Sequence, residues 1–526
     1  MCFEEHAVQG LQTIPSDSRV VDNPTEEHHV SSTVYGSREA RTGIPRLEMG
    51  EDEMDPQLAK RFVQDELLMD GNPSLNLASF VTTYMDDCAQ ELMLQTLTIN
   101  AVDSEEYPAV EEIDHRCVSM ISRLFHAPRD NENNEAVGTS TIGSSEAIIL
   151  AVLAAKKRWK NKRKAEGKST ENPNIVMSAG VQVCWEKAAR YTEVEEKFWH
   201  ASPGQYAADP KELVDLVDEN TILVVAILGS TYTGVYEDVA GINAELEKKN
   251  KAEGLDVTIH VDAASGGFVA PFVRPDLVWD FRLPLVSSIN TSGHKYGLVV
   301  AGCGWAFWRN KSYLPEEILF TVNYLGSPQI SFQLNFSKSA ANIVAQYYQL
   351  LRLGKNGYRA IMQNLASTAE YLQDEVEKMG DGMFEVLSEG RNGVPLVAFR
   401  IVKDKPYDEF AIAAHMRQRG WILPAYTLFP KASAIPSLGQ EIKVLRVVVR
   451  EDLSRSRCET LVRDLKEAID ALDHAPVEMQ RHLSKSQAAG DTRSKHHPTH
   501  HSANRSVHMH EKHSLAGKHG KTHAVC

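Results

Sequence analysis

The chain has 526 residues, a formal net charge of −15 and a pI near 5.8. This length is too great for one compact core and suits two domains with tails, and a hydrophobic content of 42% is enough for most of the chain to fold. The acidic balance argues against a general affinity for nucleic acid or anionic membranes, and no apolar run reaches the roughly 18 residues that span a bilayer.

The N-terminal segment is predicted to be a polar arm. Residues 1–50 carry scattered Ser, Thr and charged side chains, and the chain starts with the acidic MCFEEHAVQG, which lacks a signal-peptide core. The 7 cysteines have neither paired spacing nor a zinc pattern, so free thiols and no metal site are expected. These features favour a cytoplasmic protein.

Helical apolar spacing begins at residues 54–71, so the arm and its helix are assigned to residues 1–74. Residues 146–167 predict a helix with a buried first half and a strongly basic end. A nucleic-acid contact is one interpretation of that basic end. Cations are stabilised at a helix C-terminus by about 0.3–1 kcal/mol, however, which favours a solvated helix end instead.

Four short apolar runs predict the strands of a large domain over residues 75–365. Runs that are apolar on both faces are typical of a mostly parallel sheet covered by helices, and helical or loop segments separate them here. The runs are NIVMS (174–178), TILVVAILG (221–229), VTIHVD (257–262) and LVSSIN (285–290).

A smaller α/β domain is predicted over residues 366–473. A long helical pattern at 342–372 precedes alternating strand-like and helix-like runs, namely VPLVAFRIV, DEFAIAAHMRQRG, IKVLRVVVRED and RCETLVRDLKEAIDALDHA. The remainder, residues 474–526, is predicted to be a His-rich, disordered tail, because 10 of the 20 histidines lie in residues 482–526 with few large apolar groups.

Two features of the large domain carry polar side chains at places that suit a ligand. GTSTIGSSEA (138–147) runs from small residues into a helix, so Ser144 and Ser145 either bind a phosphate at the helix N-terminus or only cap the helix. Asp262 ends the strand in HVDAASGG. It therefore lies at the sheet edge where α/β proteins bind ligands, or it bonds to a neighbouring loop.

A third feature is Lys295 in INTSGHKYG (289–297), between a predicted strand and the apolar GLVVAGCGWAFW. Burial disfavours an ammonium group, so this amine tends toward a lowered pKa and can form an imine with a carbonyl; a snorkelling surface lysine is the alternative. A phosphate cup, a strand-end acid and an imine-forming lysine together predict a site for pyridoxal 5′-phosphate.

Several short motifs, which occur in the same order, resemble those of the glutamate decarboxylases of eukaryotic or fungal type. These are pyridoxal-phosphate enzymes of the aspartate-aminotransferase fold. The resemblance runs from about residue 33 to residue 473. It implies an α/β fold type I protein that converts L-glutamate to 4-aminobutyrate and CO2 and consumes one proton. The motifs are NLASF, VDSEEYP, GTSTIGSSEA, QVCWEKAARY, TYTGVYED, HVDAASGGFVAPF, SGHKYG and NYLG.

The resemblance also implies how the cofactor is held. Lys295 resembles the lysine that bonds the cofactor aldehyde, and Asp262 resembles the acid that keeps the ring nitrogen protonated. Gln182 resembles the residue over one ring face, with a strand-end polar residue as the alternative. The remaining implied contacts are Ala264 under the ring, Ser144, Ser145 and His294 near the phosphate, Thr231 and Thr233 on a facing loop, and Ser337 from the partner subunit.

For the substrate, Arg446 resembles the arginine that binds the α-carboxylate; without the resemblance, a paired surface charge on an edge strand would be preferred. Ser79, Phe80 and Asp103 resemble residues of the segments that hold the distal carboxylate across the subunit boundary. Relatives often carry Thr in place of Ser79, and some carry Arg in place of Lys338.

The proton donor to the substrate is either Lys295 or a mobile-loop residue such as Tyr324. Other substrates in the same fold, namely aspartate, cysteine sulfinate or an aromatic amino acid, and a non-catalytic scaffold remain as alternatives. NLASF and VDSEEYP supply hydrogen-bonding groups, which favours a carboxylate over an aromatic side chain.

The partners implied are L-glutamate and at least a second copy of the chain, with hexamers left open, and neither nucleic acid nor membrane. Calmodulin binding is weakly supported, because residues 482–526 lack the spaced apolar anchors of a calmodulin-binding helix. The clustered histidines could instead sense pH or bind a metal ion, and a solvated tail is the simplest interpretation.

Overall fold

The computed structural model describes residues 45–128, 136–202, 204–322, 329–428 and 442–476. By internal contacts the chain divides into two units, Met1–Asn72 and Pro73–Cys526. In the first unit, helix α1 (Pro56–Leu67) begins at Asp55, whose carboxylate accepts from the first free backbone N–H groups. Within the described ranges, no helix carries an apolar stretch long enough to cross a membrane.

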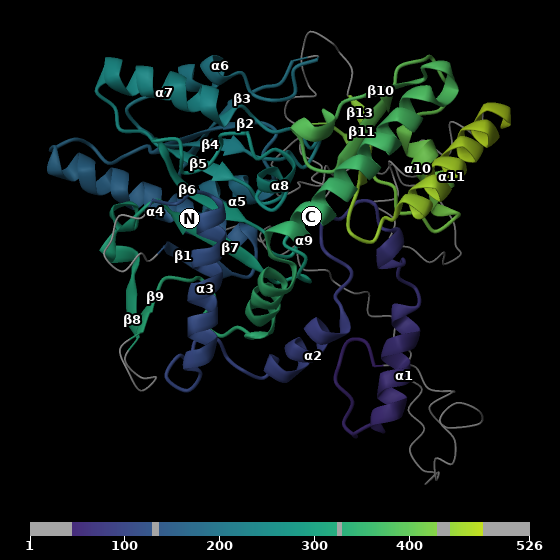
Figure 1. Ribbon diagram of the computed structural model, residues 1–526, viewed down its shortest axis with the longest axis horizontal. Coiled ribbons are helices and arrows are strands. Elements are labelled where there is room, and N and C mark those ends of the chain that lie inside the picture. Colours follow the sequence, from purple (N-terminus) through teal and green to yellow (C-terminus); the bar gives the residue numbers. More distant parts are fainter. Residues whose placement is uncertain (1–44, 129–135, 203, 323–328, 429–441, 477–526) are drawn as a thin grey trace, which may run out of the picture. The chain divides into compact units, whose positions relative to one another are not determined.

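The second unit contains a seven-stranded sheet in the order β1-β7-β6-β5-β4-β2-β3 (Figure 1). Strands β3, β2, β4, β5 and β6 are parallel, whereas β7 is antiparallel to both β6 and β1. The prediction of a mostly parallel sheet is confirmed. The strands are β1 (Val137–Thr141), β2 (Asn174–Ser178), β3 (Glu195–Trp199), β4 (Thr221–Ile227), β5 (Ile259–Asp262), β6 (Val286–Thr291) and β7 (Gly304–Trp308).

Helices cover both faces of this sheet because its strands are apolar on both sides. In β2, Ile175 and Met177 pack in a cluster with residues of α4 and α5, whereas Val176 belongs to a second cluster with residues of α6 and α7. The helices of this part are α2 (Asp87–Thr96), α3 (Pro108–Leu124), α4 (Ser144–Ala165), α5 (Val183–Tyr191), α6 (Pro210–Asp215), α7 (Val239–Glu253) and α8 (Ala270–Val273).

A second, antiparallel sheet follows in the order β10-β11-β13-β12. Helix α9 (Ala341–Lys378) precedes it, and the predicted domain boundary at residues 365/366 falls inside this helix. The other elements are a hairpin, β8 (Phe320–Val322) with β9 (Gln329–Ser331), then β10 (Phe384–Val386), β11 (Leu396–Ile401), α10 (Glu409–Arg417), β12 (Ala425–Thr427), β13 (Lys443–Val448) and α11 (Arg455–His474).

The turn after β5 lies directly against the chain that leaves β4. The backbone N–H of Gly266 donates to the Leu228 carbonyl at 2.9 Å, and a Cβ at Gly266 would clash with that carbonyl. Glycine is therefore required here by close backbone approach. This contact fixes the turn after Asp262 at the carboxyl edge of the parallel strands, where α/β sheets bind ligands.

Candidate active site

Lys295 lies on the turn that follows β6, and a preceding segment holds this turn in place. The Lys295 amine donates to Ser265 Oγ at 3.1 Å and lies 5.1 Å from the centroid of the Phe80 ring. The Thr82 hydroxyl donates to the Lys295 carbonyl at 2.7 Å, and the Thr82 N–H donates to the His294 carbonyl at 2.9 Å. Backbone contacts therefore fix the point from which the amine projects.

Asp262 ends β5 as predicted and is 6% exposed. Its carboxylate accepts from Trp185 Nε1 at 2.7 Å, from Asn290 Nδ2 at 3.1 Å and from the Ala264 N–H at 3.1 Å. Both earlier interpretations therefore apply, since Asp262 bonds a neighbouring turn and also lies at the ligand-binding edge. The protein presents only donors to this carboxylate, as a fixed negative charge requires.

His260 supports this arrangement from inside the sheet. It is fully buried, packs edge-on against the Trp185 ring at 5.2 Å, and bonds to Ser288 Oγ and Asn290 Oδ1 at 2.7 Å each. Burial lowers the pKa of His260. The ring therefore acts as a neutral link that orients Asn290, which in turn donates to Asp262.

The predicted phosphate cup contains one partner that the sequence did not indicate. Ser144, at the start of α4, shares a short hydrogen bond with Ser292, which lies on the Lys295 turn. A Cβ at Gly143 would lie 3.0 Å from His294 Cε1. The start of α4 and the Lys295 turn therefore meet, with hydroxyl groups at a helix N-terminus where anions bind.

His294 is neutral at neutral pH, because burial and then the nearby Lys295 charge lower its pKa to about 4. The Cys303 N–H donates to His294 Nδ1 at 3.3 Å. The neutral ring therefore carries its proton on Nε2, which leaves Nε2 as a hydrogen-bond donor.

Arg446 is not the surface charge that the alternative interpretation expected. It lies on β13, between β11 and β12, and is 0% exposed. Its guanidinium donates to the carbonyls of Thr231 and Ala78 and lies 5.2 Å from the centroid of the Phe80 ring. Among the described residues Arg446 Nε has no hydrogen-bond partner. A buried cation that is held by carbonyls, aromatic rings and the Tyr426 side chain, with no acidic partner among the described residues, is suited to an anionic ligand.

Phe80 lies between the two cations of the site. Its ring contacts the Lys295 amine and the Arg446 guanidinium, and it packs edge-on against Tyr296 at 6.4 Å. Ser79 accepts from the Val81 N–H at 3.1 Å, and its carbonyl accepts from Arg450 at 2.7 Å. The NLASF segment is therefore part of the same site as Lys295.

The other predicted residues lie apart from this contact network. Gln182 is the N-cap of α5 and accepts from the Cys184 N–H at 2.6 Å, so its position over a ring face stays a prediction. Ser145 and Ser337 are exposed, and Asp103 is half-buried. Tyr324 lies outside the described residues.

Four residues near Lys295 and Asp262 were not predicted from the sequence. Trp185 and Ser265 belong to motifs that carried the resemblance, QVCWEKAARY and HVDAASGG, but no pattern within those motifs separates them from their neighbours. Asn290 and Ser292 lie before Lys295 in the chain. Their roles depend on contacts across the sheet, which a linear pattern does not reveal.

The donor set fits pyridoxal 5′-phosphate. Ser144, Ser292 and the His294 Nε2 proton are donors suited to a phosphate, and Asp262 is an acceptor for a protonated ring nitrogen. Among the described residues, the hydroxyl of Thr233 in the facing loop is buried without a hydrogen-bond partner. Such an orphaned group indicates a missing polar ligand.

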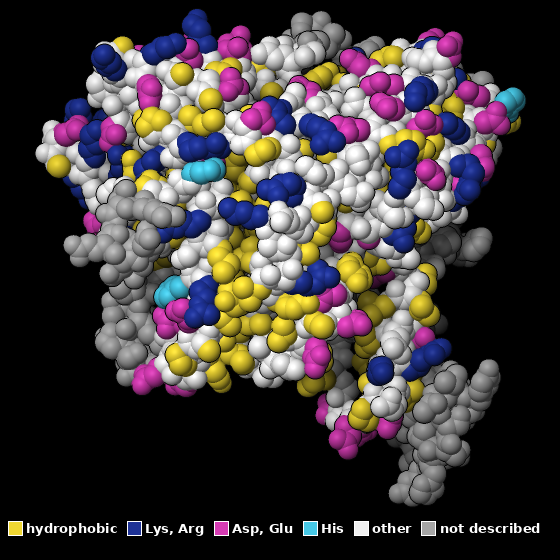
Figure 2. All heavy atoms as spheres, viewed as in Figure 1, with side chains coloured by type: hydrophobic (Ala, Val, Ile, Leu, Met, Phe, Trp, Pro, Cys, Tyr) yellow, Lys and Arg dark blue, Asp and Glu magenta, His cyan; other side chains and the backbone are white. Residues whose placement is uncertain are grey.

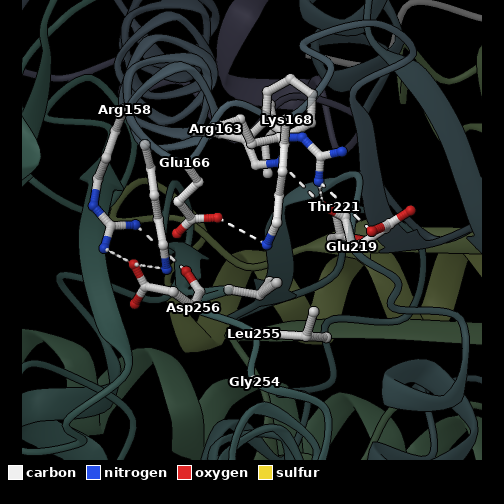
Figure 3. Close-up of a pocket in the computed structure, with 13 residues that line it drawn as sticks. Arg158, Arg163, Glu166, Lys168, Glu219, Thr221, Gly254, Leu255 and Asp256 are labelled. Carbon is white, nitrogen blue, oxygen red and sulfur yellow. Dashed lines mark hydrogen bonds and ion pairs between the residues drawn. The ribbon is translucent and has the colours of Figure 1, made fainter.

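A separate cavity of about 60 Å³ lies at the other end of α4 (Figure 3). Its cations are matched by acids of the same chain, since Arg158 and Lys162 both pair with Asp256, at 2.6 and 3.2 Å. Because α4 has 22 residues, this cavity is about 30 Å from the Ser144 end. The basic end of the predicted helix is therefore used in ion pairs within the chain.

Comparison with known proteins assigns this arrangement to a family. The conserved domain of pyridoxal-dependent decarboxylases matches residues 51–402. Glutamate decarboxylase from Petunia hybrida is 51% identical over 452 residues, which cover 86% of this chain and 88% of the relative. Glutamate decarboxylase from Aliivibrio fischeri is 42% identical, over 84% of this chain and 93% of the relative.

Solved structures agree with the sequence relatives. Glutamate decarboxylase from Lactobacillus brevis has a TM-score of 0.79 and 41% identity, and the match covers 84% of this chain and 98% of that one. A sphingosine-1-phosphate lyase from Burkholderia pseudomallei, at 23% identity and a TM-score of 0.68, has the same fold. The predicted fold is confirmed, but these plant and bacterial relatives give no support to the expected fungal type.

Proposed function

Since this chain belongs to the pyridoxal-dependent decarboxylases and, within them, to the glutamate decarboxylases, we propose that it converts L-glutamate to 4-aminobutyrate and CO2 with pyridoxal 5′-phosphate as its cofactor. The observation that carries an amino-acid substrate is the buried guanidinium of Arg446, which is suited to an α-carboxylate and lies beside the Phe80 ring that also contacts Lys295. The choice of glutamate among amino acids is supported by the glutamate decarboxylase relatives.

The cofactor, when bound, supplies a carbonyl for an amine and a ring that accepts the electrons of the broken C–C bond. Lys295 provides the amine that attaches it. Asp262, held by three donors, provides the negative charge that keeps the ring nitrogen protonated. Ser144 and the Nε2 proton of His294 donate to its phosphate.

Orientation decides which bond of the substrate breaks. Arg446 binds one carboxylate of glutamate through a charge-assisted hydrogen bond, because its Nε is the free donor of a group otherwise bound to carbonyls. The Phe80 ring lies against both this guanidinium and the Lys295 amine. A substrate held at one carboxylate and at its amino group has one Cα bond presented for cleavage.

The reaction consumes one proton, because a C–H bond at Cα replaces the C–CO2 bond. Lys295 is one candidate donor, since its amine lies in the site and is already bonded to a hydroxyl, Ser265 Oγ. The other candidate, Tyr324, lies outside the described residues.

The test is identification of the product with added cofactor. L-glutamate should give 4-aminobutyrate, whereas aspartate, cysteine sulfinate and aromatic amino acids should give no comparable product. Borohydride reduction should attach the cofactor to Lys295, and Lys295→Ala should lose both this label and the visible absorption of the bound cofactor. Lys355→Met, at an exposed position of α9, is the matched control. Labelling of a different lysine would overturn the assignment.

The proposal includes a homodimer. Figure 2 shows hydrophobic side chains gathered on one face over α2 and its neighbours. Exposed apolar residues of α2, its C-terminal end and α3 support a contact with a second copy, because exposed apolar surface marks interfaces. They are Leu94, Leu97 and Met120.

A cytoplasmic location is also proposed. Among the described residues, 5 cysteines are free thiols and all but Cys88 are buried, which suits a reducing compartment. The proposals for the tail, namely calmodulin binding, pH sensing or a solvated segment, fall on residues 477–526, outside the described part of the chain.

A further inference from the structure

A cluster of three polar side chains lies away from Lys295 and plays no part in the chemistry proposed above; Ser140 is buried, and Asp114 and Lys338 are half-buried. It consists of Asp114 on α3, Ser140 on β1 and Lys338 in the segment before α9. The Ser140 hydroxyl donates to Asp114 Oδ2 at 2.5 Å, and the Lys338 amine donates to Ser140 Oγ at 2.7 Å and to the Ser140 carbonyl at 3.3 Å. We name it the Lys338 cluster.

The Lys338 cluster is costly to bury. Burial raises the pKa of Asp114 and lowers the pKa of Lys338, because each group loses its hydration. The second oxygen of Asp114, Oδ1, is buried and has no hydrogen-bond partner among the described residues. Among the described residues no direct ion pair joins Asp114 to Lys338, because Ser140 bridges the two groups. Such a network of buried polar atoms contributes little net stability relative to apolar side chains of similar size, whereas it fixes geometry closely. The cluster is therefore better explained by positioning than by stability.

Backbone hydrogen bonds of Lys338 also hold a second segment, residues 99–101, in place. The Lys338 N–H donates to Asn100 Oδ1 at 3.2 Å, and its carbonyl accepts from the Ala101 N–H at 2.8 Å. The Ala340 N–H donates to the Ile99 carbonyl at 2.9 Å. Residues 99–101 and 338–340 thus pair side by side, and the cluster ties both segments to β1.

The predicted site residues Asp103 and Ser337 lie next to these two segments in the chain, Asp103 two residues after Ala101 and Ser337 immediately before Lys338. Within the described residues, neither has a hydrogen bond to the network of Lys295 and Arg446, and Ser337 is exposed. Leu334, also in this region, is 50% exposed. Two polar residues beside exposed apolar surface are placed to meet a second copy of the chain.

We propose that Lys338 is a positioning residue, whose amine, bonded to Ser140 beside Asp114, fixes the segments of Asp103 and Ser337 where they complete the active site of a partner subunit. This inference rests on the proposed decarboxylase dimer. It makes one distinctive prediction, namely that loss of the Lys338 amine impairs the partner's site and leaves the active site of its own chain intact.

The experiment uses mixed dimers of holoenzyme. Two chains with different tags, one Lys295→Ala and one Lys338→Met, are co-expressed and the mixed dimer is purified through both tags. Only one active site of this mixed dimer has a lysine at position 295, and it belongs to the Lys338→Met chain. The segments of Asp103 and Ser337 that complete this site come from the other chain, in which Lys338 is intact. We expect this dimer to have the wild-type KM for L-glutamate at half the wild-type activity, whereas the Lys338→Met homodimer has a KM raised about tenfold.

Controls separate this effect from loss of folding and from failure of the proposed function. Lys338→Arg, which keeps the charge and the donors, should restore the wild-type KM. If Lys338→Met does not fold, the double variant Asp114→Asn with Lys338→Met is used, because it removes both charges. This double variant then takes the place of the Lys338→Met chain in the mixed dimer. The wild-type homodimer tests the proposed function in the same assay. A raised KM in the mixed dimer, a wild-type KM in the Lys338→Met homodimer, or a fully active monomer would overturn the inference.

Discussion

At the scale of single residues, buried charged side chains are the candidates for function. Burying a charge costs free energy, so each such side chain needs a partner that explains it. Arg446 is fully buried and has no ion pair to an acid among the described residues; its partners are two carbonyls, the Phe80 ring and the Tyr426 side chain. Arg450 follows Arg446 in the chain, just after β13, and is also buried. It pairs with Asp452 at 3.2 Å and donates to the Ser79 carbonyl. This difference in partners makes Arg446, rather than Arg450, the candidate for binding an anionic ligand.

Arg446→Lys should raise the KM for L-glutamate at least about thirtyfold, because loss of one partner of a buried charged hydrogen bond costs 2 kcal/mol or more. The cofactor content should stay unchanged, since Lys295 and Asp262 do not contact Arg446 directly. Steady-state kinetics and absorption of the bound cofactor measure the two effects.

Arg400→Lys is the control, because Arg400 lies in the same sheet and pairs with Glu385 at the surface. An unchanged KM in Arg446→Lys would contradict the assignment of this guanidinium to substrate binding.

Glu237 is a second residue whose burial has a measurable consequence. Burial raises its pKa from 4.5 to about 7, although the Ile227 N–H donates to its carboxylate at 2.7 Å. The folded chain therefore binds a proton that the unfolded chain has lost between these pH values. The free energy of unfolding should fall across this window by on the order of 3 kcal/mol, since one pKa unit corresponds to about 1.4 kcal/mol.

Glu237→Gln should remove this pH dependence, because a neutral amide resembles the protonated acid and keeps an oxygen for the Ile227 N–H. Denaturant unfolding of the holoenzyme at about pH 5 and about pH 8 measures it. The variant should match the wild type at the lower pH and exceed it at the higher. Glu377→Gln, at an exposed position of α9, controls for charge alone; an equal pH slope in wild type and Glu237→Gln would refute the expectation.

At the scale of elements, the site depends on turns that join the two sheets. Tyr296, next to Lys295, is buried, and its hydroxyl donates to the carbonyls of Pro395 and Val449, at 3.0 and 3.3 Å. Val449 directly follows β13, the strand of Arg446. One hydroxyl therefore links the turn that carries the Lys295 amine to the end of the strand that carries the Arg446 guanidinium.

Tyr296→Phe should raise the KM for L-glutamate several-fold with little change in cofactor binding, because it removes this link and leaves the ring packed against Phe80. Titration of the cofactor and steady-state kinetics distinguish the two. Tyr407→Phe, which removes a hydroxyl bonded to Asp473 in another part of the chain, is the matched control. Equal KM values in Tyr296→Phe and the control would show that the link has no role in substrate binding.

At the scale of the whole molecule, exposed apolar side chains predict association. Leu94 is 72% exposed and Leu97 is 60% exposed, on and just after α2. Covering one such side chain stabilises an interface by about 1.5–3 kcal/mol. Two of them are enough to alter a dimer equilibrium strongly.

Leu94→Glu with Leu97→Glu should weaken the dimer at least about hundredfold and lower activity in parallel, because Asp103 and Ser337 could then no longer reach a partner's site. Analytical ultracentrifugation with activity measured over the same concentrations tests this. Val402→Glu, at a half-exposed position after β11, should leave both unchanged. A wild-type chain that is monomeric and fully active would exclude the shared site.

The sequence alone determined the layered fold and the central chemistry. Runs that are apolar on both faces identify parallel strands, and the predicted runs at 174–178, 221–229, 257–262 and 285–290 correspond to β2, β4, β5 and β6. Strands β1 and β3 were not identified, because polar residues interrupt their apolar pattern, and β7 was not separated from the longer apolar run GLVVAGCGWAFW that contains it. Lys295 and Asp262 were found because each follows directly from a strand that periodicity identifies.

Only the tertiary structure decided which residues surround these two. Burial and hydrogen bonding depend on segments far apart in the chain: Trp185 meets Asp262, Ser265 meets Lys295, and Arg446 meets Ala78. A linear sequence reports the chemical type of each side chain, whereas the cost of burying it depends on every element packed around it. For that reason Arg446 resembles a surface charge in the sequence and is a fully buried cation in the fold.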